Sequence, residues 1–504
     1  MQVISMNVIK KQAFISTIFS YAGVLVGFIS QFFIFPNFFE KEEIGLLNVL
    51  LSYMYVMVQL SSLGFNAAGS RFFVHFRNAR QGHKGYLFLG LSIGMVGFLL
   101  CSIGVFFLKD WMIASKGKSD LLATSFYFLL PITFATLLFN LFDNYAKNLY
   151  ETVTGTFLSQ FLQRFLIMAS LFLVVFKVLD FSQYIWVWVL AVSFYVVPMI
   201  WKATRLDGFS LKPDFSLMTP RFTKEFATYS FLTILTGFSS MIILYIDKIM
   251  LAEITTLQET GVYSTAAFFG SVMGMSLLAL NKASAPIIVD SFAANDLKNI
   301  DTIYRKSCTT SLIVGCWIFL GIYLNLDNLF EFLPAGFEEG RWVIIILSLG
   351  KLFDLATGLN GTILTLSPYY RYDTYIMISL IGLTVFLNWL LIPIYGMNGA
   401  AFALALATIY YNAVRYALLW WKLGMQPFTV DIPKVLLIMV LVGLAVSLIP
   451  ITEGTKFKTV IDIAYRSTAI TLIYGVIIYW SNVSPELNGA MKNLWKAVVG
   501  FGKR

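Results

Sequence analysis

Charged residues are scarce in this chain. Only 12% of its 504 residues are Asp, Glu, Lys or Arg, whereas 58% are hydrophobic, and a typical soluble domain carries about twice that share of charge. Apolar runs of about 18 to 25 residues recur along the whole length, and each can cross a hydrocarbon core of roughly 30 Å. Backbone N–H and C=O groups in lipid have no water to bind and must form hydrogen bonds with one another, so these runs are expected to be helices. The sequence predicts an all-α polytopic membrane protein with about fourteen transmembrane helices.

Cysteine and histidine are also rare, with three and two residues respectively. Cys101, Cys308 and Cys316 lie inside or at the edge of apolar runs, where a thiol packs as a small hydrophobic group. His75 and His83 share one polar loop that contains no carboxylate or thiol, so the further ligands of a metal site are missing. No metal and no cofactor is therefore predicted.

Signatures of an enzyme are lacking as well. The sequence has no Gly-x-x-x-x-Gly-Lys-Ser/Thr phosphate loop, and no polar region is long enough for a soluble ATPase or transferase domain. A membrane-embedded polymerase or glycosyltransferase needs a large outer loop or paired carboxylates near a metal, whereas the outer loops expected here are short. The sequence therefore argues against an enzyme, and a nucleotide-driven step would need a partner chain.

Basic residues outnumber acidic ones by 36 to 27, and they gather in alternate loops. Cytoplasmic loops of membrane proteins carry an excess of Lys and Arg. Assigning the basic loops, such as 71–84 and 202–224, to the cytoplasm puts both termini there as well. The basic residues flank the spans and form no soluble basic face, so no nucleic-acid partner is expected.

The stretch 244–265 has a counterpart earlier in the chain. An apolar segment runs into Asp247 and Lys248, a short acidic loop follows, and Gly261 opens the next apolar segment. The segment around Gly45 follows the same plan, with Phe-Phe-Glu-Lys-Glu-Glu before Ile-Gly. Such a repeat indicates two similar halves.

Six expected spans precede the polar loop 202–225 and six follow it. Because six is even, both halves cross the membrane in the same direction, which gives a parallel pseudo-repeat like those of secondary transporters. The predicted division is residues 1–215 as an N-lobe, 216–425 as a C-lobe, and 426–504 as two further spans with an amphipathic cytoplasmic tail.

Polar residues follow one helical face in two spans. Such stripes either line a water-filled cavity or hydrogen-bond across helix contacts, and the number of polar groups favours a cavity here. The residues are Asn48, Ser52, Tyr55 and Gln59 in one span and Gln160 and Gln163 in another.

Charges inside spans are costly and usually face a cavity or a partner. Arg164 lies about ten residues into its span, roughly 15 Å deep at about 1.5 Å per residue, and has no acid one turn away. Lys351 has Asp354 at i+3, which allows either a neutral structural pair or two functional groups. Asp247 and Lys248 point about 100° apart, so at least one needs a partner on another helix or an anion, unless Lys248 extends to the interface.

Three segments resemble a known family. They are Ile246-Asp-Lys-Ile-Met-Leu251 with Glu259-Thr-Gly-Val-Tyr-Ser264, Ile392-Pro-Ile-Tyr-Gly396-Met-Asn-Gly-Ala-Ala401, and Pro36-Asn-Phe-Phe-Glu-Lys-Glu-Glu-Ile-Gly45 with Ser62-Leu-Gly-Phe65. Each is degenerate, but their order and spacing resemble the oligosaccharide flippases of the MOP superfamily, the Wzx-like polysaccharide biosynthesis exporters of bacteria. The resemblance covers essentially the whole chain.

This resemblance implies a V-shaped transporter of two six-helix lobes in the bacterial inner membrane. It would move an undecaprenyl-diphosphate-linked oligosaccharide to the outer leaflet, with a possible polysaccharide polymerase as partner. Cationic cavity residues of relatives meet the diphosphate, and Arg164, Lys351 and Lys248 are the candidates here. Asp354 and Asp247 are candidates for binding a coupling H⁺ or Na⁺.

Two alternatives share this fold. A MATE-type drug/cation antiporter predicts an acidic cavity and about twelve spans, whereas the candidate residues here lean basic. A lipid II flippase carries a cavity arginine in its first span, and the first span of this chain has only small and polar residues. The oligosaccharide flippase is therefore the leading hypothesis.

Overall fold

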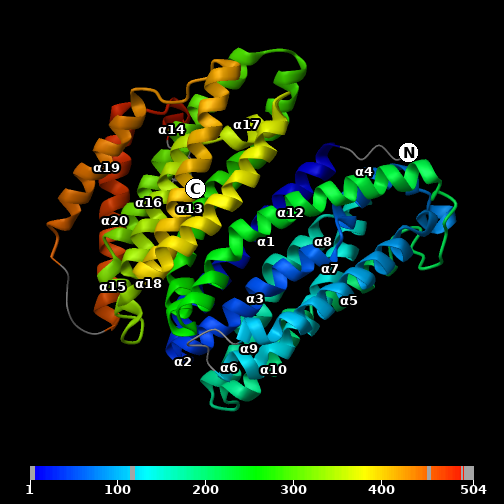
Figure 1. Ribbon diagram of the computed structural model, residues 1–504. Coiled ribbons are helices and arrows are strands. Elements are labelled where there is room, and N and C mark those ends of the chain that lie inside the picture. Colours follow the sequence, from blue (N-terminus) through cyan, green and yellow to red (C-terminus); the bar gives the residue numbers. More distant parts are fainter. Residues whose placement is uncertain (1–5, 114–119, 451–455, 490–491, 493–504) are drawn as a thin grey trace, which may run out of the picture. The chain divides into compact units, whose positions relative to one another are not determined.

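The computed structural model describes residues 6–113, 120–450, 456–489 and 492. These residues form helices and connecting loops, without a strand among them, which confirms the predicted all-α class. The chain divides into two compact units, Met1–Thr265 and Ala266–Arg504, and the division falls inside one helix (Figure 1). The expected amphipathic tail, 491–498, lies outside the described residues apart from Lys492.

The first unit is built from long apolar helices and short helical turns. In chain order they are α1 (Met6–Phe28), η1 (Ile29–Ile34), α2 (Phe35–Phe38), α3 (Lys41–Ser61), α4 (Phe65–Phe76), η2 (Ala79–Gly85), α5 (Tyr86–Ile113), α6 (Asp120–Ser125), η3 (Phe126–Phe128), α7 (Leu129–Asn148), α8 (Val153–Thr156), η4 (Phe157–Leu162), α9 (Gln163–Val175), α10 (Phe181–Ser193), α11 (Val196–Thr204) and α12 (Pro220–Ile254).

The second unit begins within the following helix. Its elements are α13 (Leu257–Ala293), α14 (Leu297–Tyr323), α15 (Leu326–Phe330), η5 (Phe337–Gly340), α16 (Arg341–Thr357), α17 (Asn360–Leu366), α18 (Tyr370–Leu423), α19 (Asp431–Ser447) and α20 (Lys456–Ser481).

Eleven helices among the described residues are long and apolar enough to cross a membrane, or twelve if the bent pair α16 and α17 forms one span. This count does not confirm the predicted number of fourteen. With the bent pair counted as one span, two further elements account for the difference between twelve and fourteen. α18 counts once although it has 54 residues, more than twice the length that a bilayer requires, and α19 has only 17 residues.

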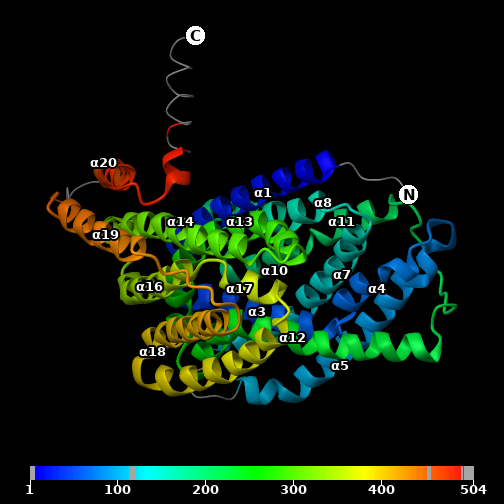
Figure 2. The same cartoon turned by 90° about the horizontal axis from the view of Figure 1, so that it is seen from above.

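α18 folds back on itself at Gly396, as Figures 1 and 2 show. This glycine has φ 53° and ψ −133°, a conformation that residues with a Cβ rarely adopt. The two arms run antiparallel, because Ser379 is hydrogen-bonded to Tyr410 at 3.0 Å and Asp373 to Arg415 at 2.8 Å. α18 therefore supplies two membrane-crossing arms joined by a tight turn.

α3 and α12 pack side by side within the first unit. Near its start, α3 also meets the first turn of α13 through the two repeated glycines. A Cβ on Gly45 would lie 1.9 Å from the carbonyl oxygen of Leu257, and a Cβ on Gly261 would lie 1.9 Å from that of Lys41. The contact is reciprocal, and it joins the two segments that the sequence repeat aligned. Both positions require glycine because backbone meets backbone there.

Neither histidine nor cysteine takes part in a metal site in the described part of the chain. The ring of His83 is buried; its Nδ1 accepts from the backbone N–H of Asn78 at 3.2 Å, and its Nε2 lies 2.9 Å from the carbonyl oxygen of Asp207. The ring thus joins two loops. All three cysteines are free thiols.

A buried ion pair within α20 lies at the centre of a polar cluster in the second unit. Arg466 and Asp462 contact each other at 3.0 Å, with side chains 3% and 4% exposed. Arg466 also donates to the carbonyl oxygens of Leu324 at 3.2 Å and Ile449 at 2.6 Å, and Asn328 donates to Asp462 at 2.6 Å. The polar groups of one cluster therefore connect α20 with α15 and with the ends of α14 and α19.

Replacing Asp462 with Ala is expected to destabilise the second unit by about 3–5 kcal/mol, because it leaves the buried guanidinium of Arg466 without its countercharge. The thermal unfolding midpoint of the purified protein in detergent measures this effect. Asp431→Asn, at an exposed pair with Lys434, is the control and should change little. Equal midpoints for the two variants would contradict the structural role.

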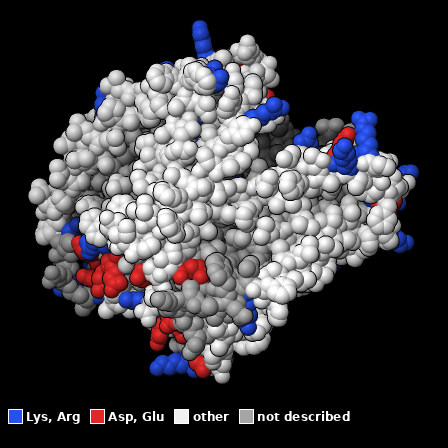
Figure 3. Space-filling model, in the orientation of Figure 1, with Lys and Arg blue, Asp and Glu red and all other residues white. Residues whose placement is uncertain are grey.

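Exposed charges gather at the ends of each unit (Figure 3). In this view, acidic side chains cluster around α15 of the second unit, and basic side chains dominate the end of the first unit that carries α4. On the face shown, the sides of the helices between these ends are almost free of charge, as expected of surfaces that face lipid. The protein is a multi-pass membrane protein.

Candidate functional site

Arg164 lies in the first turn of α9, directly after the π-helical turn η4, and its side chain is half-buried. Its Nη1 atom is shielded from solvent and makes no hydrogen bond with any described residue. A buried polar donor without a partner costs about 1–3 kcal/mol, and more when it is charged. The planar guanidinium presents donors in a fork that matches phosphate geometry. Arg164 is therefore an unsatisfied cationic donor inside the first unit.

Two tyrosines accompany Arg164. Tyr55 of α3 stacks on Tyr245 of α12, with ring centroids 4.8 Å apart and an interplanar angle of 11°. Both phenols lie within electrostatic range of the guanidinium. Three helices that are distant in sequence thus bring one cation and two hydroxyl groups together. The sequence indicated Tyr55, whereas Tyr245 carried no signal because it follows an unbroken apolar run.

The other residues of the predicted polar stripes mostly bond to backbone. Asn48 donates to the carbonyl oxygen of Ile44 at 3.0 Å, and Ser52 donates to that of Asn48 at 2.8 Å. Gln163 donates to the carbonyl oxygen of Val192 on α10 at 2.9 Å. These contacts satisfy polar groups within and between helices, as in other membrane proteins.

The remaining stripe residues, Gln59 and Gln160, lie at close helix contacts. The side-chain amide of Gln59 lies against Gly237 of α12, and the backbone carbonyl of Gln160 lies against Gly23 of α1. Both side chains are partly exposed. Whether they line a cavity remains a prediction.

Asp247 finds its partner on another helix. Its Oδ2 atom accepts from the hydroxyl of Tyr263 on α13 at 2.5 Å, and its Oδ1 accepts from the backbone N–H of Lys248 at 2.8 Å. The carboxylate is buried, whereas the Lys248 side chain is half-buried. Near the C-terminal end of α12, Glu253 accepts a hydrogen bond from the hydroxyl of Tyr53 on α3 at 2.5 Å. The sequence did not indicate this second tyrosine–carboxylate pair.

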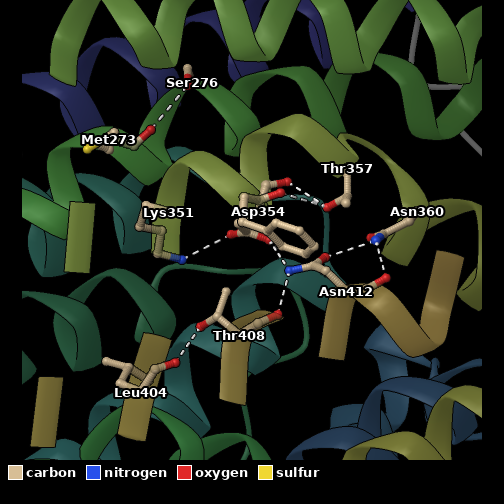
Figure 4. Close-up of polar contacts among 10 residues, drawn as sticks. Met273, Ser276, Lys351, Asp354, Thr357, Asn360, Leu404, Thr408 and Asn412 are labelled. Atoms are coloured by element: carbon tan, nitrogen blue, oxygen red, sulfur yellow. Dashed lines mark hydrogen bonds and ion pairs between the residues drawn. The ribbon is translucent and has the colours of Figure 1, made fainter. Parts of the chain in front are cut away.

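The second unit contains a polar network around Asp354 (Figure 4). Its Oδ2 contacts the ammonium of Lys351 at 3.1 Å, and its Oδ1 accepts from the amide of Asn412 at 2.9 Å. The side-chain oxygen of Asn412 in turn accepts from Asn360 at 2.9 Å. The network spans the break between α16 and α17, which bend by 51°. The sequence predicted the contact between Lys351 and Asp354, but it did not indicate that Asn360 and Asn412 belong to the same network.

A second ion pair lies nearby in the same unit. Arg415 contacts Asp373 through Nε at 2.8 Å and Nη2 at 2.7 Å, and its guanidinium lies over the ring of Tyr411 at 3.7 Å. Thr365 also donates to Asp373 at 3.1 Å. Sequence alone could not pair these residues, because they lie on opposite arms of α18 and meet only after the turn at Gly396.

Comparison with known sequences supports a family assignment. Residues 9–292, more than half of the chain, match the family described as "Polysaccharide biosynthesis protein". The capsular polysaccharide biosynthesis protein CapF of Staphylococcus aureus is 23% identical over 163 residues. That match covers 32% of this chain and 41% of the length of CapF.

Solved structures share the fold. The lipid II flippase MurJ in an inward closed conformation matches with a TM-score of 0.71 at 14% identity, over 94% of this chain and 98% of that one. An inward-facing multidrug resistance MATE family transporter of the MOP superfamily matches with a TM-score of 0.62 at 11% identity, over 80% of this chain and 94% of that one. At such identities the likeness establishes the helical architecture and nothing about substrate. Together with the sequence match, it shows that this chain belongs to the polysaccharide biosynthesis protein family and has the fold of MOP-superfamily transporters.

Proposed function

We propose that this protein is a flippase that translocates an undecaprenyl-diphosphate-linked oligosaccharide from the cytoplasmic to the periplasmic leaflet by alternating access. The observation that carries the proposal is the buried, unpartnered Nη1 of Arg164 beside Tyr55 and Tyr245. A cation that no acid among the described residues neutralises, inside an apolar helical unit, favours an anion as its ligand. Membership in the polysaccharide biosynthesis family and the match to CapF support a lipid-linked saccharide as that anion.

The chemistry of such a substrate fits these residues. A diphosphate accepts charge-assisted hydrogen bonds from a guanidinium, which are stronger in a dry site than in water. Tyrosine hydroxyls can donate further hydrogen bonds to phosphate or sugar oxygens. Lys351 and Lys248 are the other proposed cationic groups. The polyprenyl tail stays in lipid, so that only the polar headgroup crosses the protein interior.

Orientation and energy supply complete the proposal. Basic side chains that gather near α4 and acidic ones near α15 support cytoplasmic and periplasmic ends respectively, with both termini in the cytoplasm of a bacterial inner membrane. Asp354 and Asp247 are the proposed sites for a coupling H⁺ or Na⁺. Withdrawal of the product by a polysaccharide polymerase would also drive net export.

Everted inner-membrane vesicles test the function directly. A fluorescent undecaprenyl-diphosphate oligosaccharide is added to the outer face of these vesicles, which is the cytoplasmic face, and its protection from an added glycosidase is followed. We expect protection to grow with time only when the protein is present. Absence of protection, together with proton-driven uptake of an organic cation by the same vesicles, would assign the protein to the drug-antiporter class instead.

A further inference from the structure

We infer that the Lys351–Asp354 pair is exchangeable: the substrate diphosphate takes the Lys351 ammonium while a monovalent cation takes the carboxylate oxygen that Lys351 releases. The inference rests on the proposed flippase function and specifies how substrate and coupling ion depend on each other. In this scheme the ammonium of Lys351 occupies the cation-binding position on Asp354 until the substrate binds.

The geometry of the pair suits exchange. The ammonium and Oδ2 share one contact of 3.1 Å, and the side chains of Lys351 and Asp354 are 38% and 22% exposed (Figure 4). Both residues belong to α16 at i and i+3, so the contact breaks by rotation of the flexible lysine side chain without movement of a helix. A single, partly exposed ion pair is weak, so the two phosphate charges of the substrate can displace the carboxylate of Asp354 from the ammonium of Lys351.

The ion pair between Arg415 and Asp373 in the same unit shows the contrast. Arg415 contacts Asp373 through two nitrogens at 2.8 and 2.7 Å, and these side chains are only 11% and 12% exposed. The pair joins two arms of α18, so its rupture would disturb the hairpin. Arg415–Asp373 is therefore structural, whereas Lys351–Asp354 leaves the packing of its helix unchanged when it opens.

The carboxylate remains in place when the lysine leaves. Asn412 donates to Oδ1 of Asp354 at 2.9 Å, and Asn412 is itself held by Asn360 at 2.9 Å and by the carbonyl oxygen of Thr408 at 3.0 Å (Figure 4). Oδ2 is then a fixed anionic ligand without its partner, which is costly inside a membrane protein. A cation that enters from the exposed side removes that cost.

The break after α16 favours a cation at the same point. Asp354 lies in the last turn of α16, which ends at Thr357 before the 51° bend. The C-terminal end of a helix carries a partial negative charge, and discontinuous membrane helices commonly supply ion sites in transporters. In the described part of the chain, the ionisable groups that interact with Asp354 are Lys351 on its own helix and Tyr411 on α18. Arg415 and Asp373 interact with that tyrosine in turn.

Linkage makes the exchange measurable. If the diphosphate frees Asp354 for a cation, then the cation must raise the affinity for the diphosphate by the same factor. The purified full chain in nanodiscs is titrated with undecaprenyl diphosphate, once with sodium replaced by choline at constant ionic strength and once across a pH series in choline. The first comparison reports coupling to Na⁺, and the second reports coupling to H⁺.

We expect one of these cations to tighten lipid binding to the unaltered protein at least about fivefold, within the usual range of coupling between sites. Asp354→Asn should bind the lipid more tightly than the unaltered protein does without the cation, because Lys351 is already free, and should not respond to the cation. Lys351→Gln should bind the lipid more weakly. Asp431→Asn, at the i+3 pair Asp431–Lys434 of α19, should retain the full response.

The double variant Lys351→Gln/Asp354→Asn replaces the pair with neutral groups of similar size and guards against misfolding of either single variant. It should bind weakly and without a response to cations. Lipid binding that is intact but equal under all ionic conditions, or weaker in Asp354→Asn, would overturn the exchange while leaving the flippase function standing. No lipid binding by the unaltered protein would overturn both.

Discussion

Arg164→Gln is expected to reduce translocation in the vesicle assay at least about thirtyfold. Losing one partner of a buried charged contact costs about 2–5 kcal/mol, and 1.4 kcal/mol corresponds to a factor of ten. Glutamine keeps a hydrogen-bonding amide of smaller size but loses the charge and the planar fork. Since the Nη1 of Arg164 is unsatisfied without substrate, removal of the guanidinium should not destabilise the protein.

Stability and function therefore separate at this residue. The unfolding midpoint of Arg164→Gln should equal or exceed that of the unaltered protein while transport is lost. Arg164→Lys should keep part of the activity, because the charge remains without bidentate geometry. Lys177→Gln, at an exposed lysine just after α9, is the charge-matched control and should transport normally. Full transport by Arg164→Gln would exclude this arginine from the substrate site.

Alanine at Gly45 or Gly261 is expected to reduce the amount of folded protein. A Cβ at either position would lie 1.9 Å from a backbone carbonyl oxygen of the other segment, far inside van der Waals contact. Backbone cannot move aside as a flexible side chain can, so the overpacking should cost at least about 1–3 kcal/mol. The monodisperse fraction in size-exclusion chromatography and the unfolding midpoint both measure it.

Gly274→Ala is the matched control, because Gly274 lies on α13 with Gly261 and a Cβ there would meet nothing within 4 Å. It should be neutral or stabilising, since Ala favours a helix by up to about 1 kcal/mol over Gly. The double variant of Gly45 and Gly261 should lose less than the sum of the single variants, because both disrupt one crossing. Equal behaviour of Gly261→Ala and Gly274→Ala would show that the crossing is not tight.

The length of the apolar runs and the scarcity of charge determined the class of this protein. Segments of that length and composition cross a membrane as helices, because a helix forms all its backbone hydrogen bonds internally. The repeat around Gly45 and Gly261 was also readable, since close backbone approach demands glycine at both places. Arg164 and the Lys351–Asp354 pair could be identified because a charge inside an apolar run needs no three-dimensional information to be noticed. The spacing i+3 sufficed to bring the pair together.

Contacts between distant helices were decided only by tertiary structure. Tyr245, Asn360 and Asn412 lie in segments where a polar residue is unremarkable, and each gains a role through a partner on another helix. The pairing of Asp373 with Arg415 depends on the turn at Gly396. Sequence periodicity reports which face of a helix is polar, but the neighbour of that face is set by how whole helices pack.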